Sequence, residues 1–305
     1  MIQLFNVNNH TIDTSEFSNL LHDKIVTDFE KEFASYVGAK YACSVNSATN
    51  AIFLCMLNKN TVVKIPSMIP PVVANAIITS GNKVEFYDDT DWVGHSYVLH
   101  TFEDYKIVDS AQKLEPNQFM KECNPNDLMI FSHYPTKPLG GADGGIVVTD
   151  DYKKHKWMKE AVLNGMTYAD NNRERGISFP GYKFYMSSIQ AKIIMDNFKN
   201  FDKKMRSLGN LVDIYNKEFG YENTSKHLYR IEVLDNEKFI ENMKRDGIIC
   251  GIHYPALHQN PIYGKKITKL SKSEKSQRRT VSLPMNEKLS FNETEYIIDK
   301  VKENM

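Results

Sequence analysis

The sequence of 305 residues has no excess of either charge, since lysine and arginine together number 38 and aspartate and glutamate also number 38. Without a basic surplus, the composition gives no indication of a nucleic-acid partner or of binding to an acidic membrane. No apolar run approaches the roughly 20 residues that cross a bilayer. The first residues, MIQLFNVNNHTIDTSEF, lack the basic and apolar regions of a signal peptide. We therefore expect a cytoplasmic protein without a membrane span.

Cysteine is scarce, and the four cysteines are scattered without CxxC pairs or the histidine spacing of a zinc site. We expect free thiols in a reducing compartment and no metal site. The apolar fraction of 41% and the charged fraction of 25% are ordinary for a globular protein. The length is sufficient for one large domain and one smaller domain.

The most informative stretch is 128–150, LMIFSHYPTKPLGGADGGIVVTD, which predicts a strand, a polar loop, a glycine-rich hairpin and a second strand. Its loop contains Lys137 between Pro135 and Pro138, which restrict the backbone on both sides. A lysine in such a rigid, weakly polar loop can lose its water, which lowers its pKa and leaves a neutral amine able to form a Schiff base. On this stretch alone, a surface-loop lysine is the more common interpretation.

Strands and helices alternate through the first half of the chain. Strands are predicted at 40–45, 62–67, 83–87, 96–100 and 106–108, and helices at 23–36, 46–57 and 70–78. This order predicts an α/β fold, with a mostly parallel central sheet and helices on both faces. Ser47 to Asn50 open a helix where backbone N–H groups favour an anion, although an ordinary helix cap is more common. Asp109 follows a buried strand, where open α/β sheets place ligand chemistry.

The second half predicts a long helix over 187–219, with a bend, that bridges two domains. We place a large domain at 1–205 and a small C-terminal α+β domain at 206–305. Strands are expected at 228–233, 248–254 and 280–284, and Ser290 and Glu293 have the spacing of a capping box. The basic segment 265–279 lacks interleaved aromatic residues, so we interpret it as a mobile solvated loop rather than a nucleic-acid site.

Three predicted features together match the needs of pyridoxal 5′-phosphate (PLP): a helix start for the phosphate, Asp109 for the pyridine nitrogen and Lys137 for the aldehyde. Lysine and aspartate are abundant, so this spacing by itself is not specific. Six segments in order carry a more specific signal: DFEKEFASYVGAKYACSVNSATNAI, VDSAQ, FSHYPTKPLGGADGG, FPGYKFYMSSIQAKI, GIHYPALHQNPIY and VSLPMNEKLSF. Together they resemble the DegT/DnrJ/StrS family of PLP-dependent sugar-nucleotide aminotransferases, which have the aspartate-aminotransferase type I fold.

The resemblance implies specific roles for the cofactor site. It implies Lys137 as the Schiff-base lysine that later moves a proton, Asp109 on the pyridine nitrogen, and Gln112 against the ring or its 3′-oxygen. The phosphate would contact Ala48, Thr49, Asn50 and Ser132. Pro70 occupies a position where the family often has an aromatic residue over the ring, and proline stacks less well.

Other implied roles concern the partner subunit and the substrate. The segment containing Lys183 and Tyr185 resembles one that a partner subunit inserts into the neighbouring site. Lys183 would reach the neighbour's phosphate as a point charge, and a solvated lysine is an equally good interpretation. His253, Tyr254 and Tyr185 are candidates for binding substrate, and a structural role for His253 is at least as common.

The implied activity is transfer of an amino group from L-glutamate to a nucleotide-linked keto-sugar, in a homodimer with shared active sites, for deoxyamino-sugar biosynthesis such as that of lipopolysaccharide or O-antigen. The chain departs from the family between Asp88 and Asp109, where about 20 residues replace a longer insertion, so at least one helix should be missing. The alternatives are PLP chemistry on a non-nucleotide acceptor and a regulatory protein that does not transaminate.

Overall fold

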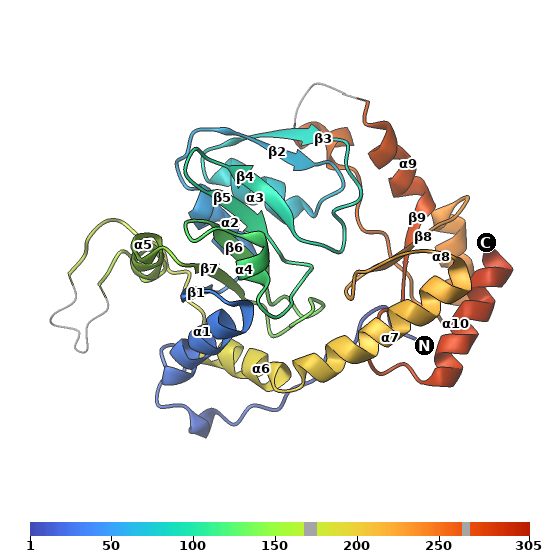
Figure 1. Ribbon diagram of the computed structural model, residues 1–305, viewed down its shortest axis with the longest axis horizontal. Coiled ribbons are helices and arrows are strands. Elements are labelled where there is room, and N and C mark those ends of the chain that lie inside the picture. The colour runs from blue at the N-terminus through green and yellow to red at the C-terminus, as the bar shows by residue number, and fades with distance from the viewer. Residues whose placement is uncertain (168–175, 264–268) are drawn as a thin grey trace.

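The computed structural model describes residues 1–167, 176–263 and 269–305, and Figure 1 shows an α/β arrangement with a central sheet beside a smaller C-terminal group of elements. The central sheet has five strands in the order β1-β7-β6-β5-β4. Its strands are β1 (Tyr41–Val45), β4 (Tyr97–Thr101), β5 (Lys106–Asp109), β6 (Leu128–Ser132) and β7 (Gly145–Thr149). A separate pair consists of β2 (Val62–Pro66) and β3 (Lys83–Tyr87). No helix in the described ranges is both long and apolar enough to cross a membrane.

The strand directions correct one expectation, because the sheet is mixed rather than mostly parallel. The β5–β6 and β2–β3 pairs are parallel, whereas β1–β7, β6–β7 and β4–β5 are antiparallel. Only residues 102–105 separate β4 from β5, and so short a connection joins antiparallel neighbours only. Between β3 and β5 the chain forms only a turn and β4, with no helix. This agrees with the missing helix that we expected from the short stretch between Asp88 and Asp109.

Helices cover both faces of the central sheet (Figure 1). One face packs against α1 (Lys24–Val37) and α6 (Ser188–Phe198), and its core includes Phe29, Phe33 and Phe131. Helix α1 has a strongly amphipathic pattern and ends at Gly38, whose left-handed conformation is typical of a helix end. The opposite face packs against α2 (Ala48–Met56), α3 (Pro71–Thr79) and α5 (Tyr152–Val162). The short elements are α4 (Gln118–Glu122) and the 3-10 helices η1 (Thr14–Glu16), η2 (Leu257–Gln259) and η3 (Pro261–Tyr263).

In place of one bent helix over 187–219, the structure has two helices, α6 and α7 (Phe201–Phe219), which are interrupted at residues 199–200. Figure 1 shows α7 leading from the sheet to the C-terminal elements. These are the antiparallel pair β8 (Tyr229–Glu232) and β9 (Thr280–Leu283), with α8 (Asn236–Arg245), α9 (Ser271–Arg279) and α10 (Phe291–Asn304). Ser290 and Glu293 form the predicted capping box. A division at residue 205 falls inside α7 and stays a prediction.

The strand expected at 248–254 does not form. Residues 248 and 251 make isolated bridges, one to Ile2 and the other to Ser282. Because the segment divides its hydrogen bonds between two different neighbours, no continuous ladder develops along either one.

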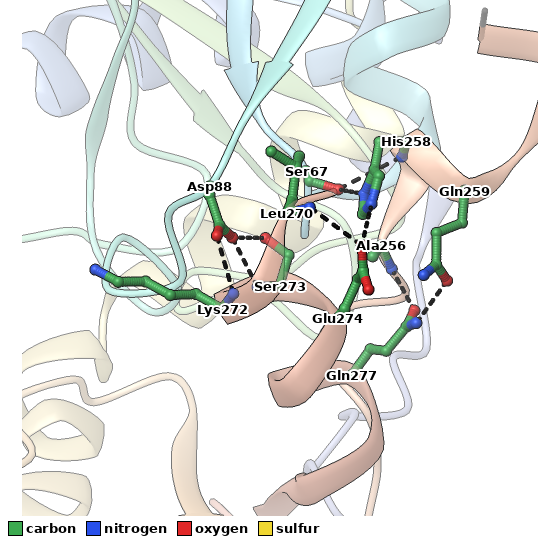
Figure 2. A network of polar contacts seen from close by, with 10 residues as sticks. All are labelled: Ser67, Asp88, Ala256, His258, Gln259, Leu270, Lys272, Ser273, Glu274 and Gln277. Carbon is green, nitrogen blue, oxygen red and sulfur yellow. Dashed lines mark hydrogen bonds and ion pairs between the residues drawn. The ribbon is translucent and has the colours of Figure 1, made fainter. Parts of the chain in front are cut away.

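The basic segment is also different from the expectation, because 271–279 forms the helix α9 (Figure 2). Asp88, at the end of β3, accepts hydrogen bonds from the amides of Lys272 (2.9 Å) and Ser273 (2.7 Å) and from the Ser273 hydroxyl (2.8 Å). A carboxylate there satisfies amides that a helix start leaves unpaired. The cap lies 184 residues away in the sequence, so local pattern alone does not reveal it. The part of the predicted loop at 265–268 lies outside the described residues.

A second set of contacts in Figure 2 joins α9 to the end of β2. The buried Ser67 hydroxyl lies 2.5 Å from Nδ1 of His258, and Nε2 of His258 lies 3.3 Å from the Glu274 carboxylate. Gln277 accepts a hydrogen bond from the Ala256 amide at 2.9 Å. These bonds attach the C-terminal elements to the β2–β3 pair, next to the residues that lead from β2 to Pro70.

Candidate active site

A cavity of about 520 Å³ lies where the carboxyl ends of β5 and β6 meet the start of α2. Because β5 and β6 are parallel, the residues that follow them emerge at the same edge of the sheet. Nine of the candidates from the sequence line this cavity: Ala48, Thr49, Pro70, Asp109, Gln112, Ser132, Lys137, His253 and Tyr254. Segments far apart in the sequence therefore converge on one space.

Lys137 lies in the loop between β6 and β7, and its amide donates to the Tyr134 carbonyl at 2.9 Å. The side chain is only partly exposed, towards the cavity. Burial lowers the pKa of the Lys137 amine to about 8, although the nearby Asp109 carboxylate favours the charged form. About a tenth of such an amine is neutral at pH 7. The desolvated lysine expected from the sequence is thus present, and its neutral form is a nucleophile.

Asp109 ends β5 and is 4% exposed. Its Oδ1 accepts a hydrogen bond from the Ala111 amide and its Oδ2 accepts one from the Tyr97 hydroxyl, each at 2.9 Å. Burial raises the pKa of Asp109, while these two donors and the charge on Lys137 favour the carboxylate. The two hydrogen bonds fix the plane of the carboxyl group inside the cavity wall.

The start of α2 forms one end of the cavity. Ser47 caps the helix by accepting from the Asn50 amide, while the amides of Ala48 and Thr49 belong to the first turn, where a helix supplies no partner. Gly145, at the start of β7, allows the backbones of β7 and α2 to approach closely, because a Cβ on this residue would lie 2.6 Å from the Ala48 nitrogen. This end has the donor groups that a phosphate requires.

Two further candidates line the cavity and one candidate side chain turns elsewhere. Gln112 is 4% exposed and accepts a hydrogen bond from the Gly94 amide at 2.7 Å. Pro70 precedes α3 and borders the same space. The Asn50 side chain instead donates to Asn46 at 2.8 Å, so only its backbone belongs to the helix start.

Sequence reasoning missed an aromatic part of the wall. Trp92 packs against Tyr97 with ring centroids 4.7 Å apart, and stacks on Tyr254 with centroids 6.2 Å apart and planes 14° apart. Phe5 stacks on His227 at 5.3 Å, and all of these residues line the cavity. The only signal in the sequence is the rarity of tryptophan, of which there are two. The ring positions depend on contacts between distant segments.

Two of the histidines that line the cavity, His253 and His227, are uncharged near neutral pH. Burial lowers the pKa of His253 to about 4, with the positive charges of Lys137 and Arg230 acting in the same direction. Nδ1 of His253 lies 2.9 Å from the Ser282 hydroxyl. Burial also lowers the pKa of His227 well below its usual value. Neutral imidazoles each present one hydrogen-bond donor and one acceptor.

Lys183 and Tyr185 do not line the cavity of their own chain. Lys183 is exposed and forms an isolated bridge with Leu163. Tyr185 forms a bridge with Val45, and its ring packs 4.4 Å from the ring of His22. Their assigned roles therefore require a second subunit and stay predictions.

An amine, a buried carboxylate and a helix start around one cavity at the ends of parallel strands define the kind of site that holds PLP. The donor set fits each part of that molecule: Lys137 for the aldehyde, Asp109 for the ring nitrogen, and the first amides of α2 for the phosphate. Comparison with known proteins agrees. The chain belongs to the DegT/DnrJ/EryC1/StrS aminotransferase family, which it matches over residues 7–93 and 107–302.

Several relatives support this assignment. The chain is 24% identical to the UDP-4-amino-4,6-dideoxy-N-acetyl-beta-L-altrosamine transaminase of Campylobacter jejuni, over 96% of this chain and 94% of the relative. It is 22% identical to the UDP-2-acetamido-2-deoxy-3-oxo-D-glucuronate aminotransferase of Pseudomonas aeruginosa, over 86% and 85% of the two chains. The Campylobacter alignment spans 357 positions, which is longer than this chain, so that relative contains segments that are absent here.

Solved structures show the same fold. Helicobacter pylori PseC, an aminotransferase of pseudoaminic acid biosynthesis, superposes with a TM-score of 0.78 at 19% identity, covering 95% of this chain and 93% of PseC. The sugar aminotransferase CalS13 of Micromonospora echinospora gives 0.81 at 16% identity, with full coverage of both chains. The predictions of a type I fold, an aminotransferase and PLP as its cofactor are confirmed.

Proposed function

We propose that the protein is a PLP-dependent aminotransferase that moves an amino group from L-glutamate to a nucleotide-linked keto-sugar. The observation that carries the proposal is the Lys137 amine, which faces a cavity bounded by Asp109 and by the start of α2. The names of its relatives indicate the acceptor, because both transaminases cited above are named for UDP-linked sugars.

PLP supplies an electron sink that stabilises negative charge at a carbon next to the bound amine. The protein's own groups orient the cofactor and transfer protons to and from it. Asp109 would hold the ring nitrogen in its protonated form, and the amides of Ala48 and Thr49, with Ser132, would hold the phosphate. Once the amino donor is bound, the freed Lys137 amine would accept the proton that leaves the donor carbon and would deliver it to the cofactor carbon that carried the aldehyde. A pKa of about 8 suits this exchange near neutral pH.

The substrate side of the cavity is formed by neutral and aromatic groups. His253 and Tyr254 offer hydrogen bonds to sugar hydroxyls, and Trp92 offers an apolar face. We propose that two chains form a homodimer in which Lys183 and Tyr185 of one chain reach the site of the other. We also propose that the chain divides into a large domain at 1–205 and a small domain at 206–305. The same proposal places the protein in the cytoplasm, at a step in O-antigen or lipopolysaccharide synthesis.

The reaction can be tested in two halves. Purified protein reconstituted with PLP and given L-glutamate should release 2-oxoglutarate in an amount equal to its active sites. It should release more only when a keto-sugar nucleotide is added. Lys137→Ala should release none while keeping the fold. Absence of 2-oxoglutarate from the wild-type protein would refute glutamate as donor.

A specific observation favours a second candidate, transamination of an acceptor without a nucleotide. Residues 94–106 lie outside the family match, yet His95 and Tyr97 line the cavity, so this wall differs from the one that the family supplies. Release of one 2-oxoglutarate per active site, combined with failure of every nucleotide sugar tested to increase it, would favour this acceptor. Failure of glutamate turnover despite tight PLP binding would favour a regulatory role.

A further inference from the structure

The segment that the family match does not cover, residues 94–106, leads into the hairpin of β4 and β5 and forms most of it. This segment is not a peripheral loop, because it forms the edge strand of the central sheet beside the strand that ends at Asp109. The first residue of the segment, Gly94, donates its amide to the buried Gln112 at 2.7 Å. A residue with a Cβ does not fit at Gly94, where φ is +94° and the added atom would lie 2.5 Å from the Ser225 hydroxyl.

Tyr97 is the residue of this hairpin that contacts the candidate cofactor site most directly. It lies opposite Asp109 in the antiparallel register of β4 and β5, and opposite residues project their side chains from the same face of a sheet. Its hydroxyl donates to Oδ2 of Asp109 at 2.9 Å, and its ring packs against Trp92. Burial, and then the charge on Asp109, raise the pKa of Tyr97 well above its usual value, so the hydroxyl keeps its proton and remains a donor.

We propose that Tyr97 is a positioning residue for the cofactor, which holds the Asp109 carboxylate in the orientation that receives the cofactor's ring nitrogen. The inference rests on the proposed function, since it assumes that Asp109 meets that nitrogen. A carboxylate has about four lone-pair sites. The Ala111 amide occupies one on Oδ1 and Tyr97 occupies one on Oδ2. These two bonds prevent rotation of the carboxylate and leave a lone pair directed at the cavity.

The proposal explains how a chain shorter than its relatives can still hold the residues assigned to the cofactor ring in place. This part of the chain lies where the family resemblance implies a longer connection. It fixes two residues that the resemblance assigns to the ring, Asp109 through Tyr97 and Gln112 through Gly94. Tyr97 does not touch the reacting atoms in this account. It acts through Asp109, and its effect should therefore depend on the presence of the ring nitrogen in the ligand.

The test measures dissociation constants of the wild-type protein, Tyr97→Phe and Tyr105→Phe for two ligands. One ligand is PLP, and the other is its analogue in which a C–H group replaces the ring nitrogen. Tyr105→Phe is the matched control, since it removes a hydroxyl from the same hairpin and keeps the ring that stacks on Phe102. We expect Tyr97→Phe to weaken PLP binding by about tenfold, the size of losing a hydrogen bond to a charged group. Its affinity for the analogue should stay within about twofold of wild type, as should both affinities of the control.

Equal weakening for both ligands would overturn the proposal, because it would indicate a general loss of packing. An unchanged PLP affinity in Tyr97→Phe would overturn it as well. Failure of the wild-type protein to bind PLP would be a separate result, one that refutes the proposed function itself. Thermal unfolding of each variant without ligand checks that the hairpin remains folded.

Discussion

Replacing Lys137 with methionine should stabilise the protein when it is free of PLP. The pKa of the Lys137 amine falls from 10.5 to about 8, and each tenfold change in proton affinity corresponds to about 1.36 kcal/mol. Keeping this amine protonated in the folded protein therefore costs about 3 kcal/mol. Methionine retains an unbranched side chain of similar length without the charge, so Lys137→Met should unfold with a free energy about 3 kcal/mol higher at pH 7.

The gain should depend on pH with a defined sign. Below about pH 8 the folded and unfolded chains both carry the proton, and the full cost applies. Between about pH 8 and pH 10.5 the folded chain loses the proton while the unfolded chain keeps it, so the wild-type protein gains stability as pH rises. The advantage of Lys137→Met should shrink over this interval and vanish above it.

Urea unfolding of both proteins between about pH 6 and pH 10 measures the difference. The control is Lys203→Met, at an exposed position on α7, which should show no comparable pH-dependent gain. A variant less stable than wild type at pH 7, or an advantage that stays constant with pH, would refute the reasoning that Lys137 is desolvated.

Three further outcomes follow from the site and its supports. Gly145→Ala places a Cβ 2.6 Å from the first amide nitrogen of α2, so PLP affinity should fall at least about tenfold, whereas Gly176→Ala, with open space around it, should bind normally. Mixing inactive Lys137→Ala subunits with Lys183→Ala subunits should restore activity if each site is shared, because one hybrid site then contains both lysines; no recovery would contradict the shared site. Asp88→Ala removes the cap of α9 and should lower the free energy of unfolding by about 1–2 kcal/mol, measured by urea unfolding.

The central sheet residues, and the convergence of the three groups that we assign to the cofactor, were predictable from the sequence because their signals are local. Asp109 directly follows a buried strand, Ser47 and the residues after it open a helix, and Lys137 lies in a loop bounded by prolines. Each of these features depends on neighbours in the chain, and a parallel strand pair then brings them together.

The features that sequence reasoning missed depend on distant contacts. Tyr97 reaches Asp109 only through the register of a hairpin with a bulge, and Trp92 meets Tyr254 across 162 residues of chain. Helix α9 depends on a cap supplied by Asp88, far away in the sequence. Predicting that β4 runs antiparallel to β5 would have required recognising that the four residues 102–105 form a turn rather than a crossover connection.

The most direct test of the account is to locate the lysine that bears the cofactor. The protein reconstituted with PLP would be reduced with borohydride, digested, and mapped by mass spectrometry. The account predicts one pyridoxyl group per chain, attached to Lys137, and no labelled peptide after prior removal of PLP. Attachment to a different lysine, or no attachment despite bound PLP, would contradict the assignment of Lys137.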